Sequence, residues 1–138
     1  MLLKNLFGTS GIRGERGKEI TEKFSFEVAR AFGRYLGQGK RVVVGRDNRP
    51  GAVDISNAAV HGLSAVGVKV IDFGVLPTPE LSFHLVRIKA DGGVMITGSH
   101  LPIKYLGIIP LLKDGSGVFG KSGAAITKIY EKNTSDLS

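Results

Sequence analysis

Strand-like and helix-like stretches alternate along this chain, and this alternation constrains its fold more than any other feature. Three short runs of β-branched and apolar residues predict buried strands, at 40–45, 68–73 and 92–97. Between them, apolar residues recur at helical spacing over 51–66 and again from Thr78 to about Ile88. Strands that alternate with helices pair in parallel, because each crossover returns the chain to the same edge of the sheet. We therefore expect an α/β fold with helices on both faces.

The segments before the first of these strands predict a further strand, a loop and a helix. Residues 2–7 are short and mostly apolar, which is typical of a strand, and the glycine-rich, mildly basic stretch 8–19 predicts a loop. Apolar residues then return at helical spacing over 21–37. Thr21 is a suitable N-cap for this helix and Gly37 a suitable stop.

The C-terminal third is expected to complete the sheet. Two runs could add edge strands, at 105–112 and 117–119. Pro110 should confine the first of them to an edge or a bulge, because proline has no N–H to donate. A last helix is expected over 121–132. We expect residues 1–132 to form a single domain, a three-layer α/β/α sandwich with a mostly parallel mixed sheet, and residues 133–138 to be a polar tail or an interdomain linker.

Composition and charge exclude several classes of function. The chain has 138 residues and no cysteine, so disulfide scaffolds, cysteine zinc sites and thiol catalysis are excluded. The net charge of +7 suits an anionic partner, but lysine and arginine never form a run longer than two, so nucleic acid is an unlikely partner. No apolar stretch approaches the roughly 18 residues of a membrane span, and the N-terminus lacks the apolar core of a signal peptide. We expect no membrane association and a cytoplasmic location.

Polar and glycine-containing segments follow the predicted strands at the place where α/β sheets put their binding sites. They are GRDNRP at 45–50, GVLPTP at 74–79 and TGSHLP at 97–102, with the N-terminal GTSGIRG at 8–14 as a fourth candidate. The chain has neither a P-loop nor a dinucleotide-binding motif. It also lacks the histidine spacing or aspartate-rich loop of a complete metal site.

Ser99 and three arginines are the residues in these segments most suited to chemistry. Ser99 follows a strand and Gly98, so a tight turn could expose its hydroxyl as a nucleophile or covalent carrier; the alternative is that it caps a turn. A hydrolase triad is poorly supported, because the segment is not G-x-S-x-G. The arginines could bind phosphate or carboxylate oxygens, or could pair with surface aspartates. They are Arg13, Arg46 and Arg49.

Four segments together resemble the first domain of the α-D-phosphohexomutases, the phosphomannomutase/phosphoglucomutase family. FGTSGIRG at 7–14 is similar to the opening motif of the family, and VGRDNR at 44–49 to its G-R-D-x-R segment. GVLPTP at 74–79 resembles its G-x-x-P-T-P loop. GVMITGSH at 93–100 resembles the strand and turn that carry the phosphorylated serine, usually written T-A-S-H-N-P. The segments follow the order of the family along nearly the whole chain.

The resemblance implies an isomerase that works by phosphoryl transfer. Ser99 would give its phosphoryl group to a hexose phosphate and take the other one back from the bisphosphate, which moves phosphate between C6 and C1. Arg13 would approach the transferring group, and His100 would orient it or exchange a proton near it. Mg²⁺ would bind through the Ser99 phosphate, with carboxylates from a domain outside this chain. The resemblance gives substrate or phosphate binding to Thr9, Ser10, Arg46, Arg49, Thr97 and Lys104.

The resemblance covers one domain of a four-domain family and departs from its pattern at three positions. It implies as partners the remaining mutase domains, in the same or another chain. Leu101 and Leu106 stand where the family usually has asparagine, and Ile109 where it has a lysine thought to help proton transfer. Lys104 lies nearby, and whether it replaces that amine is an open question at this point.

These departures keep a second hypothesis open. The chain could be a stand-alone, non-catalytic domain that binds phosphosugars, regulates, or binds partner domains. In either case the isolated domain would expose faces that normally meet its neighbours. We therefore expect some self-association.

Overall fold

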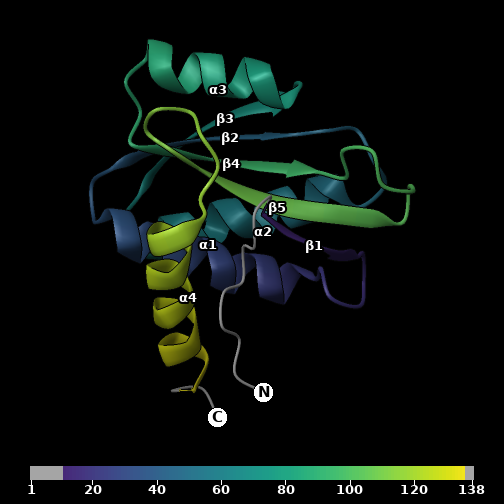
Figure 1. Ribbon diagram of the computed structural model, residues 1–138, viewed down its shortest axis with the longest axis horizontal. Helices are drawn as coiled ribbons and strands as arrows, with labels where there is room; N and C mark the ends of the chain where they lie inside the picture. Colours follow the sequence, from purple (N-terminus) through teal and green to yellow (C-terminus); the bar gives the residue numbers. More distant parts are fainter. Residues whose placement is uncertain (1–10, 136–138) are drawn as a thin grey trace.

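The computed structural model describes residues 11–135 as a five-stranded sheet between two layers of helices (Figure 1). The strands lie in the order β1-β5-β4-β2-β3. β2 pairs in parallel with β3 and β4, whereas β5 is antiparallel to both β4 and β1. Within this sheet β5 therefore runs against the other four strands, which confirms the expected α/β sandwich with a mixed sheet. In chain order the elements are β1 (Ile12–Glu15), α1 (Glu22–Leu36), β2 (Arg41–Arg46), α2 (Ala52–Ala65), β3 (Lys69–Val75), α3 (Thr78–Arg87), β4 (Gly92–Thr97), β5 (Tyr105–Leu112) and α4 (Gly120–Ser135).

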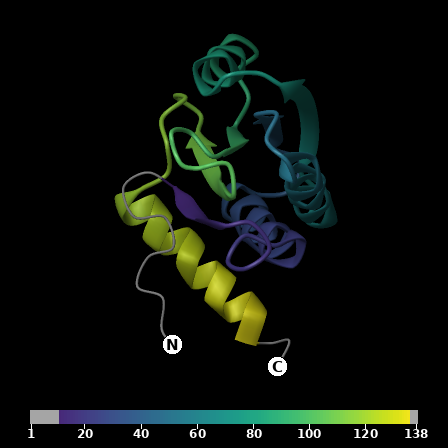
Figure 2. The same cartoon turned by 90° about the vertical axis from the view of Figure 1, so that its right-hand side faces the viewer.

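The helices cover the two faces of the sheet unequally. α1, α2 and α4 lie on one face and α3 on the other (Figure 2). The larger core cluster joins Phe32 and Leu63 of the three-helix side to Val44 of β2. The smaller cluster packs Leu81 and Leu85 of α3 on the opposite face. Because side chains alternate along a strand, each strand residue can be assigned to one of these two faces.

Helix α1 begins and ends where the sequence predicts. The Thr21 hydroxyl accepts a hydrogen bond from the Phe24 N–H at 3.1 Å, which satisfies one of the free donors of the first turn. Gly37 follows the helix with φ of 115°, a conformation that residues with a β-carbon rarely adopt. Local signals are sufficient here because both ends of the helix are fixed by neighbouring residues.

The N-terminal region differs from its prediction. Residues 12–15, expected to lie in a loop, form the edge strand β1, whose Ile12 pairs with Ile108 and Glu15 with Tyr105. The sequence IRGE has no strand periodicity of its own, so its conformation depends on pairing with β5, far along the chain. The strand expected at 2–7 lies outside the described residues.

Strand β5 is not an edge strand, contrary to the expectation drawn from Pro110. It lies between β1 and β4, but the short β1 pairs with its first four residues alone. Pro110 lies beyond that pairing, and its carbonyl accepts a hydrogen bond from Val118 N–H at 3.0 Å. Its backbone nitrogen therefore faces away from β4, where a missing N–H removes no ladder bond. The run 117–119 forms an isolated bridge, Leu111 to Gly117, and not a strand.

Helix α4 is longer than the predicted 121–132 and runs from Gly120 to Ser135. Asn133, in a stretch that looks like a polar tail, is buried, and its side-chain oxygen accepts a hydrogen bond from Arg34 of α1. This contact between distant elements extends the helix. No helix among residues 11–135 is long and apolar enough to cross a membrane.

Candidate active site

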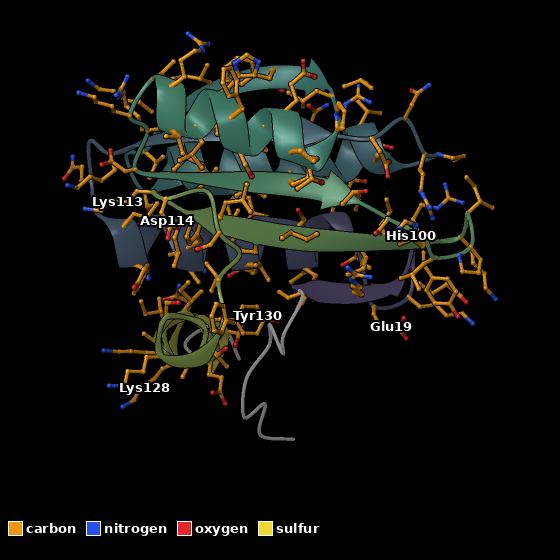
Figure 3. All side chains as sticks on the ribbon, turned by 45° about the horizontal axis from the view of Figure 1, so that its top comes forward. Glu19, His100, Lys113, Asp114, Lys128 and Tyr130 are labelled. Carbon is orange, nitrogen blue, oxygen red and sulfur yellow. The ribbon has the colours of Figure 1, made fainter. Side chains whose placement is uncertain are left out.

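The motif segments at 45–50, 74–79 and 97–102 lie at one end of the sheet, where the parallel strands β2, β3 and β4 finish. β1, β2 and β4 finish there and β5 begins there, so the loops at 16–19, 47–50 and 98–104 lie together. Figure 3 shows His100 and Glu19 at this end, and Lys113 and Asp114 at the opposite end. The sheet thus brings together residues that lie far apart in the sequence.

Ser99 occupies a tight turn directly after β4. The Leu101 N–H donates to the Gly98 carbonyl at 2.9 Å and closes the turn. Ser99 has φ of 52°, and Lys89 is the other non-glycine residue of the described chain with positive φ. Such left-handed backbone costs on the order of 1–3 kcal/mol and concentrates at functional sites. The residue is exposed, and its hydroxyl has no hydrogen-bond partner within residues 11–135.

Thr97, and not Ser99, supplies the side-chain cap of this turn. The Thr97 hydroxyl accepts a hydrogen bond from the Ser99 N–H at 3.0 Å and donates one to Asp47 Oδ2 at 2.9 Å. The capping role that the sequence left open for Ser99 is therefore filled by its neighbour. Among the described residues, the Ser99 hydroxyl is therefore left without a partner at the end of the sheet.

Asp47 connects the loop after β2 to the turn after β4. Its Oδ2 accepts hydrogen bonds from the Thr97 hydroxyl and from the Gly98 N–H, both at 2.9 Å. Its Oδ1 accepts one from the Arg49 N–H at 3.0 Å, and its own N–H donates to the Ile96 carbonyl at 2.9 Å. One carboxylate thus fixes the relative position of the two loops.

Arg49 contacts the backbone of the serine turn directly. Its Nη2 donates to the Ser99 carbonyl at 2.8 Å, and its Nη1 to the carbonyls of Pro102 at 2.7 Å and Tyr105 at 3.2 Å. Its Nε lies 3.5 Å from Asp47 Oδ2. The side chain is 15% exposed, so this is no solvated surface pair. Sequence reasoning expected a phosphate-binding cation here, and the structure places a guanidinium whose donors already face protein oxygens.

Arg13 lies in the edge strand β1, next to the strand that follows the serine turn. It pairs across the sheet with Gly107, which in turn pairs with Thr97 of β4. A β-carbon on Gly107 would lie 3.2 Å from Arg13 Cγ, so the arginine side chain lies over this glycine, on the α3 face. Arg13 is exposed, and its guanidinium has no partner in the described part of the chain. Arg46, by strand alternation, belongs to the opposite face with Val44.

Two of the three departures from the family pattern lie in β5, on opposite faces of the sheet. Leu106 is fully buried in the core that faces α1, α2 and α4. Ile109 is half-buried on the other face, which it shares with Arg13 and Gly107. Leu101 lies half-buried in the serine turn. Ile109 is therefore the departure in β5 that changes the face carrying Arg13.

Lys104 and His100 extend the same end of the sheet. Lys104 Nζ lies 3.4 Å from Glu15 Oε1, and Lys18 Nζ lies 3.1 Å from Glu15 Oε2. The hydrogen bond from Lys18, more than the bond from Lys104, holds the pKa of Glu15 below its usual 4.5. His100 is exposed at the tip of the turn (Figure 3). Thr9 and Ser10, predicted to bind phosphate, lie outside the described residues.

Sequence reasoning missed the structural role of Asp47. It treated this residue as a surface partner for arginines, although its place between Arg46 and Arg49 in the G-R-D-x-R segment was a usable signal. Among residues 11–135, no three His, Asp or Glu side chains are grouped as a metal site.

Comparison with known proteins identifies the family. Residues 4–137 match the family model described as phosphoglucomutase/phosphomannomutase, alpha/beta/alpha domain I. The chain belongs to this family. A protein named as a probable phosphoglucosamine mutase from Methanosphaera stadtmanae is 41% identical over 133 residues, which cover 95% of this chain and 29% of that protein.

Further relatives agree with this assignment to the mutase family. A phosphoglucosamine/phosphogalactosamine mutase from Sulfurisphaera tokodaii is 42% identical over 110 residues, 80% of this chain and 24% of the relative. The crystal structure of a phosphoglucomutase/phosphomannomutase family protein from Burkholderia thailandensis superposes with a TM-score of 0.82 at 31% identity. The superposed part covers 97% of this chain and 31% of the Burkholderia thailandensis chain. The mutase-family chain described here thus spans less than a third of the length of these relatives.

Proposed function

We infer that this chain is the phosphoryl-carrying first domain of a phosphohexomutase. The observation that carries the proposal is the exposed Ser99 hydroxyl on a hydrogen-bonded turn, two residues after Thr97, which pairs with Gly107, the β-sheet partner of Arg13. Within residues 11–135, neither the Ser99 hydroxyl nor the Arg13 guanidinium has a partner. Members of this family with the same domain are named as mutases of hexose phosphates. The names of these relatives make glucosamine phosphate the first substrate to test.

Phosphoryl transfer at Ser99 would proceed between oxygen atoms. A hydroxyl of the hexose phosphate attacks the phosphorus of the phosphoserine, the bond from phosphorus to Ser99 Oγ breaks, and the proton of the attacking hydroxyl is released. The reverse step on the bound bisphosphate returns its other phosphoryl group to Ser99. Such transfers depend mainly on positioning and on neutralising charge.

Arg13 supplies charge where this transfer would need it. A phosphoserine carries about −1.5 to −2 charges at neutral pH. The exposed guanidinium of Arg13 can make forked hydrogen bonds to phosphate oxygens, whereas that of Arg49 is already bound to the turn. His100, exposed beside Ser99, is the candidate for orienting the group or exchanging its proton.

A phosphate on Ser99 could supply only part of the ligands that Mg²⁺ needs. A phosphate on the exposed hydroxyl would offer the oxygen ligands that Mg²⁺ prefers. The adjacent carboxylate, Asp47, is occupied by the turn. The carboxylate ligands would therefore come from another domain of the enzyme. When bound, the ion would offset the charge of the transferring phosphoryl group. Because charged sugar phosphates do not cross membranes freely, we assign the reaction to the cytoplasm.

Phosphorylation of the whole chain tests the proposal. The purified chain is incubated with Mg²⁺ and a hexose 1,6-bisphosphate, alone and with the remaining domains of a relative supplied as a separate chain. Intact mass should rise by one phosphoryl group in wild type and in the control Ser122→Ala, a serine on α4, but not in Ser99→Ala. Arg13→Ala should slow the transfer. An unchanged wild-type mass in both mixtures would reject the proposal.

A non-catalytic phosphosugar-binding domain is the second candidate function. The apolar Ile109 on the face of Arg13 favours it, because this position would carry a lysine in the family pattern. In that case hexose phosphate would bind saturably and shift the NMR signals of Arg13 and Ser99. Phosphoserine would not form, and turnover would be absent when the other domains are supplied.

A further inference from the structure

We propose that Arg49 is a positioning residue that holds the serine turn in its left-handed form. This inference rests on the proposed role of Ser99 as phosphoryl carrier, and it replaces phosphate binding as the role of Arg49. The guanidinium fixes the backbone of Ser99 and so holds its exposed side chain at the end of the sheet.

Three carbonyl groups of one loop converge on this guanidinium. They belong to Ser99, Pro102 and Tyr105, at 2.8, 2.7 and 3.2 Å from its terminal nitrogens. These residues span the whole connection from the serine turn to the start of β5. A planar fork can serve several acceptors at once, which a lysine ammonium on a flexible stem cannot reproduce in the same geometry. Arg49 therefore holds the two ends of this loop together through three hydrogen bonds.

The donors of Arg49 leave little capacity for a substrate. An arginine side chain has five N–H donors. Three of them donate to the carbonyls, and Nε lies 3.5 Å from Asp47 Oδ2, so these contacts account for four of the five. A phosphate would have to displace the turn to gain a forked contact. The geometry is that of a support for Ser99.

Hydrogen bonds tie Arg49 to neighbouring elements. Asp47 is bound to the Ile96 carbonyl through its own N–H, and its carboxylate accepts from the Arg49 N–H. The Arg49 carbonyl accepts from Ala52 N–H at 3.1 Å, at the start of α2. The position of the guanidinium is thus set by β2, β4 and α2 together, and these elements in turn set the position of Ser99.

Gly98 makes room for this contact. A β-carbon at this position would lie 2.2 Å from both Cζ and Nη1 of Arg49. Since an alanine there would expel the guanidinium, Gly98→Ala removes the support without removing the charge.

Hydrogen exchange on the whole 138-residue chain tests the support without any activity. Arg49→Lys should raise the exchange rates of the Gly98, Ser99 and Leu101 amides about tenfold or more, the equivalent of losing one charge-assisted hydrogen bond. The strand amide of Val43 should stay unchanged. Gly98→Ala should raise the Ser99 and Leu101 rates in the same way. Arg87→Lys, on α3, is the matched control and should change none of them.

The same variants are then phosphorylated with hexose 1,6-bisphosphate and the remaining domains. In Arg49→Lys and Gly98→Ala the Ser99 hydroxyl, which accepts the phosphoryl group, would be misplaced. We therefore expect the phosphorylation rate at saturating bisphosphate to fall about 10- to 100-fold in both variants. The Kd of the donor should stay within about twofold in both. This split separates positioning from binding, because a phosphate ligand would change Kd.

Each outcome decides the proposal. Unchanged exchange in the turn of Arg49→Lys, or a raised Kd with an unchanged saturating rate, would overturn it. If wild type is never phosphorylated, the proposed function fails, and the exchange data alone still decide whether Arg49 holds the turn. If Val43 also exchanges faster in Arg49→Lys, this variant has destabilised the whole fold. The exchange rates of Ser99 and Leu101 in Gly98→Ala then decide whether the contact with Arg49 holds the turn.

Discussion

At the scale of the residue, Ser99 carries a backbone conformation that favours glycine, with φ of 52°. Left-handed backbone costs an L-residue roughly 1–2 kcal/mol, while glycine costs roughly 0.5–1 kcal/mol in unfolded-state entropy. Ser99→Gly should therefore be about 0.5–1 kcal/mol more stable to unfolding than Ser99→Ala. Urea denaturation of both variants measures the difference. Lys89, with φ of 56°, offers the matched pair Lys89→Gly and Lys89→Ala, for which the same sign is expected. An equal or greater stability of Ser99→Ala would contradict the assigned strain.

Glu15 gives a second prediction at this scale, on pH. Its pKa is lowered in the folded chain, first by the hydrogen bond from Lys18 and then by Lys104. A lowered pKa means that the contribution of the pair to stability is present above the unfolded value of 4.5. It is lost as the pH falls through the folded pKa. By NMR titration, Glu15 should have its midpoint below 4.5. Lys18→Met should raise that midpoint, Lys104→Met should raise it less, and Lys113→Met, at the far end of the sheet, should leave it unchanged. A wild-type midpoint at or above 4.5 would refute this.

At the scale of the element, periodicity predicted what depends on local sequence. α1 and β4 were expected at their observed places because their signals, a cap or an apolar run, lie within the element. β1 could not be predicted, because IRGE becomes a strand only by pairing with β5, whose residues lie 90 to 96 positions further along the chain. In the candidate site, too, features of local sequence could be predicted and contacts between distant segments could not. Ser99 and Arg13 are candidates that their own segments suggest and that stay predictions, but the bonds from Asp47 and Arg49 to the serine turn join residues about 50 positions apart.

The contact between α1 and α2 reverses an expectation from helix propensity. Gly62 lies in α2, and alanine there would favour an isolated helix by roughly 1 kcal/mol. In the fold its β-carbon would lie 2.3 Å from the Phe26 carbonyl oxygen of α1, and backbone cannot move aside cheaply. Gly62→Ala should destabilise the chain by about 1–3 kcal/mol, the usual cost of overpacking. Urea denaturation measures it, with Ser64→Ala on the exposed side of α2 as a control that should change stability by less than about 0.5 kcal/mol. A stabilising Gly62→Ala would mean that the helices are not so closely packed.

At the scale of the whole molecule, the chain presents apolar surface to solvent. Phe83 and Val86 of α3 are 62% and 52% exposed, Ile103 of the serine loop 63%, and Phe119 before α4 59%. The chain spans less than a third of the length of its relatives, so a complete enzyme would have further domains that we expect to cover such faces. Self-association of the isolated chain stays a prediction on this ground. Light scattering across a concentration series tests it, and a monomer at every concentration would count against it.

The distribution of the family departures over the two faces of the sheet leads to a test in a complete enzyme. A chimaera would join this chain to the remaining domains of the Methanosphaera stadtmanae relative in place of its own first domain. General acid–base catalysis contributes roughly 10²- to 10⁴-fold. We therefore expect the chimaera to form phosphoserine but to turn over at least about 100-fold more slowly than the relative, because Ile109 offers no proton-transferring group.

Both departures in β5 can be reverted, and their faces predict opposite results. Ile109→Lys places an amine on the face of Arg13 and should raise the turnover of the chimaera at least about tenfold. Leu106→Asn also restores the residue that is usual in the family pattern, but Leu106 is fully buried on the other face of the sheet. An asparagine there would bury polar groups in an apolar core, so it should cost stability and leave turnover no higher. A chimaera that matches the relative with Ile109 in place would show that proton transfer does not depend on this face. Rescue by Leu106→Asn alone would show that the two faces are wrongly assigned.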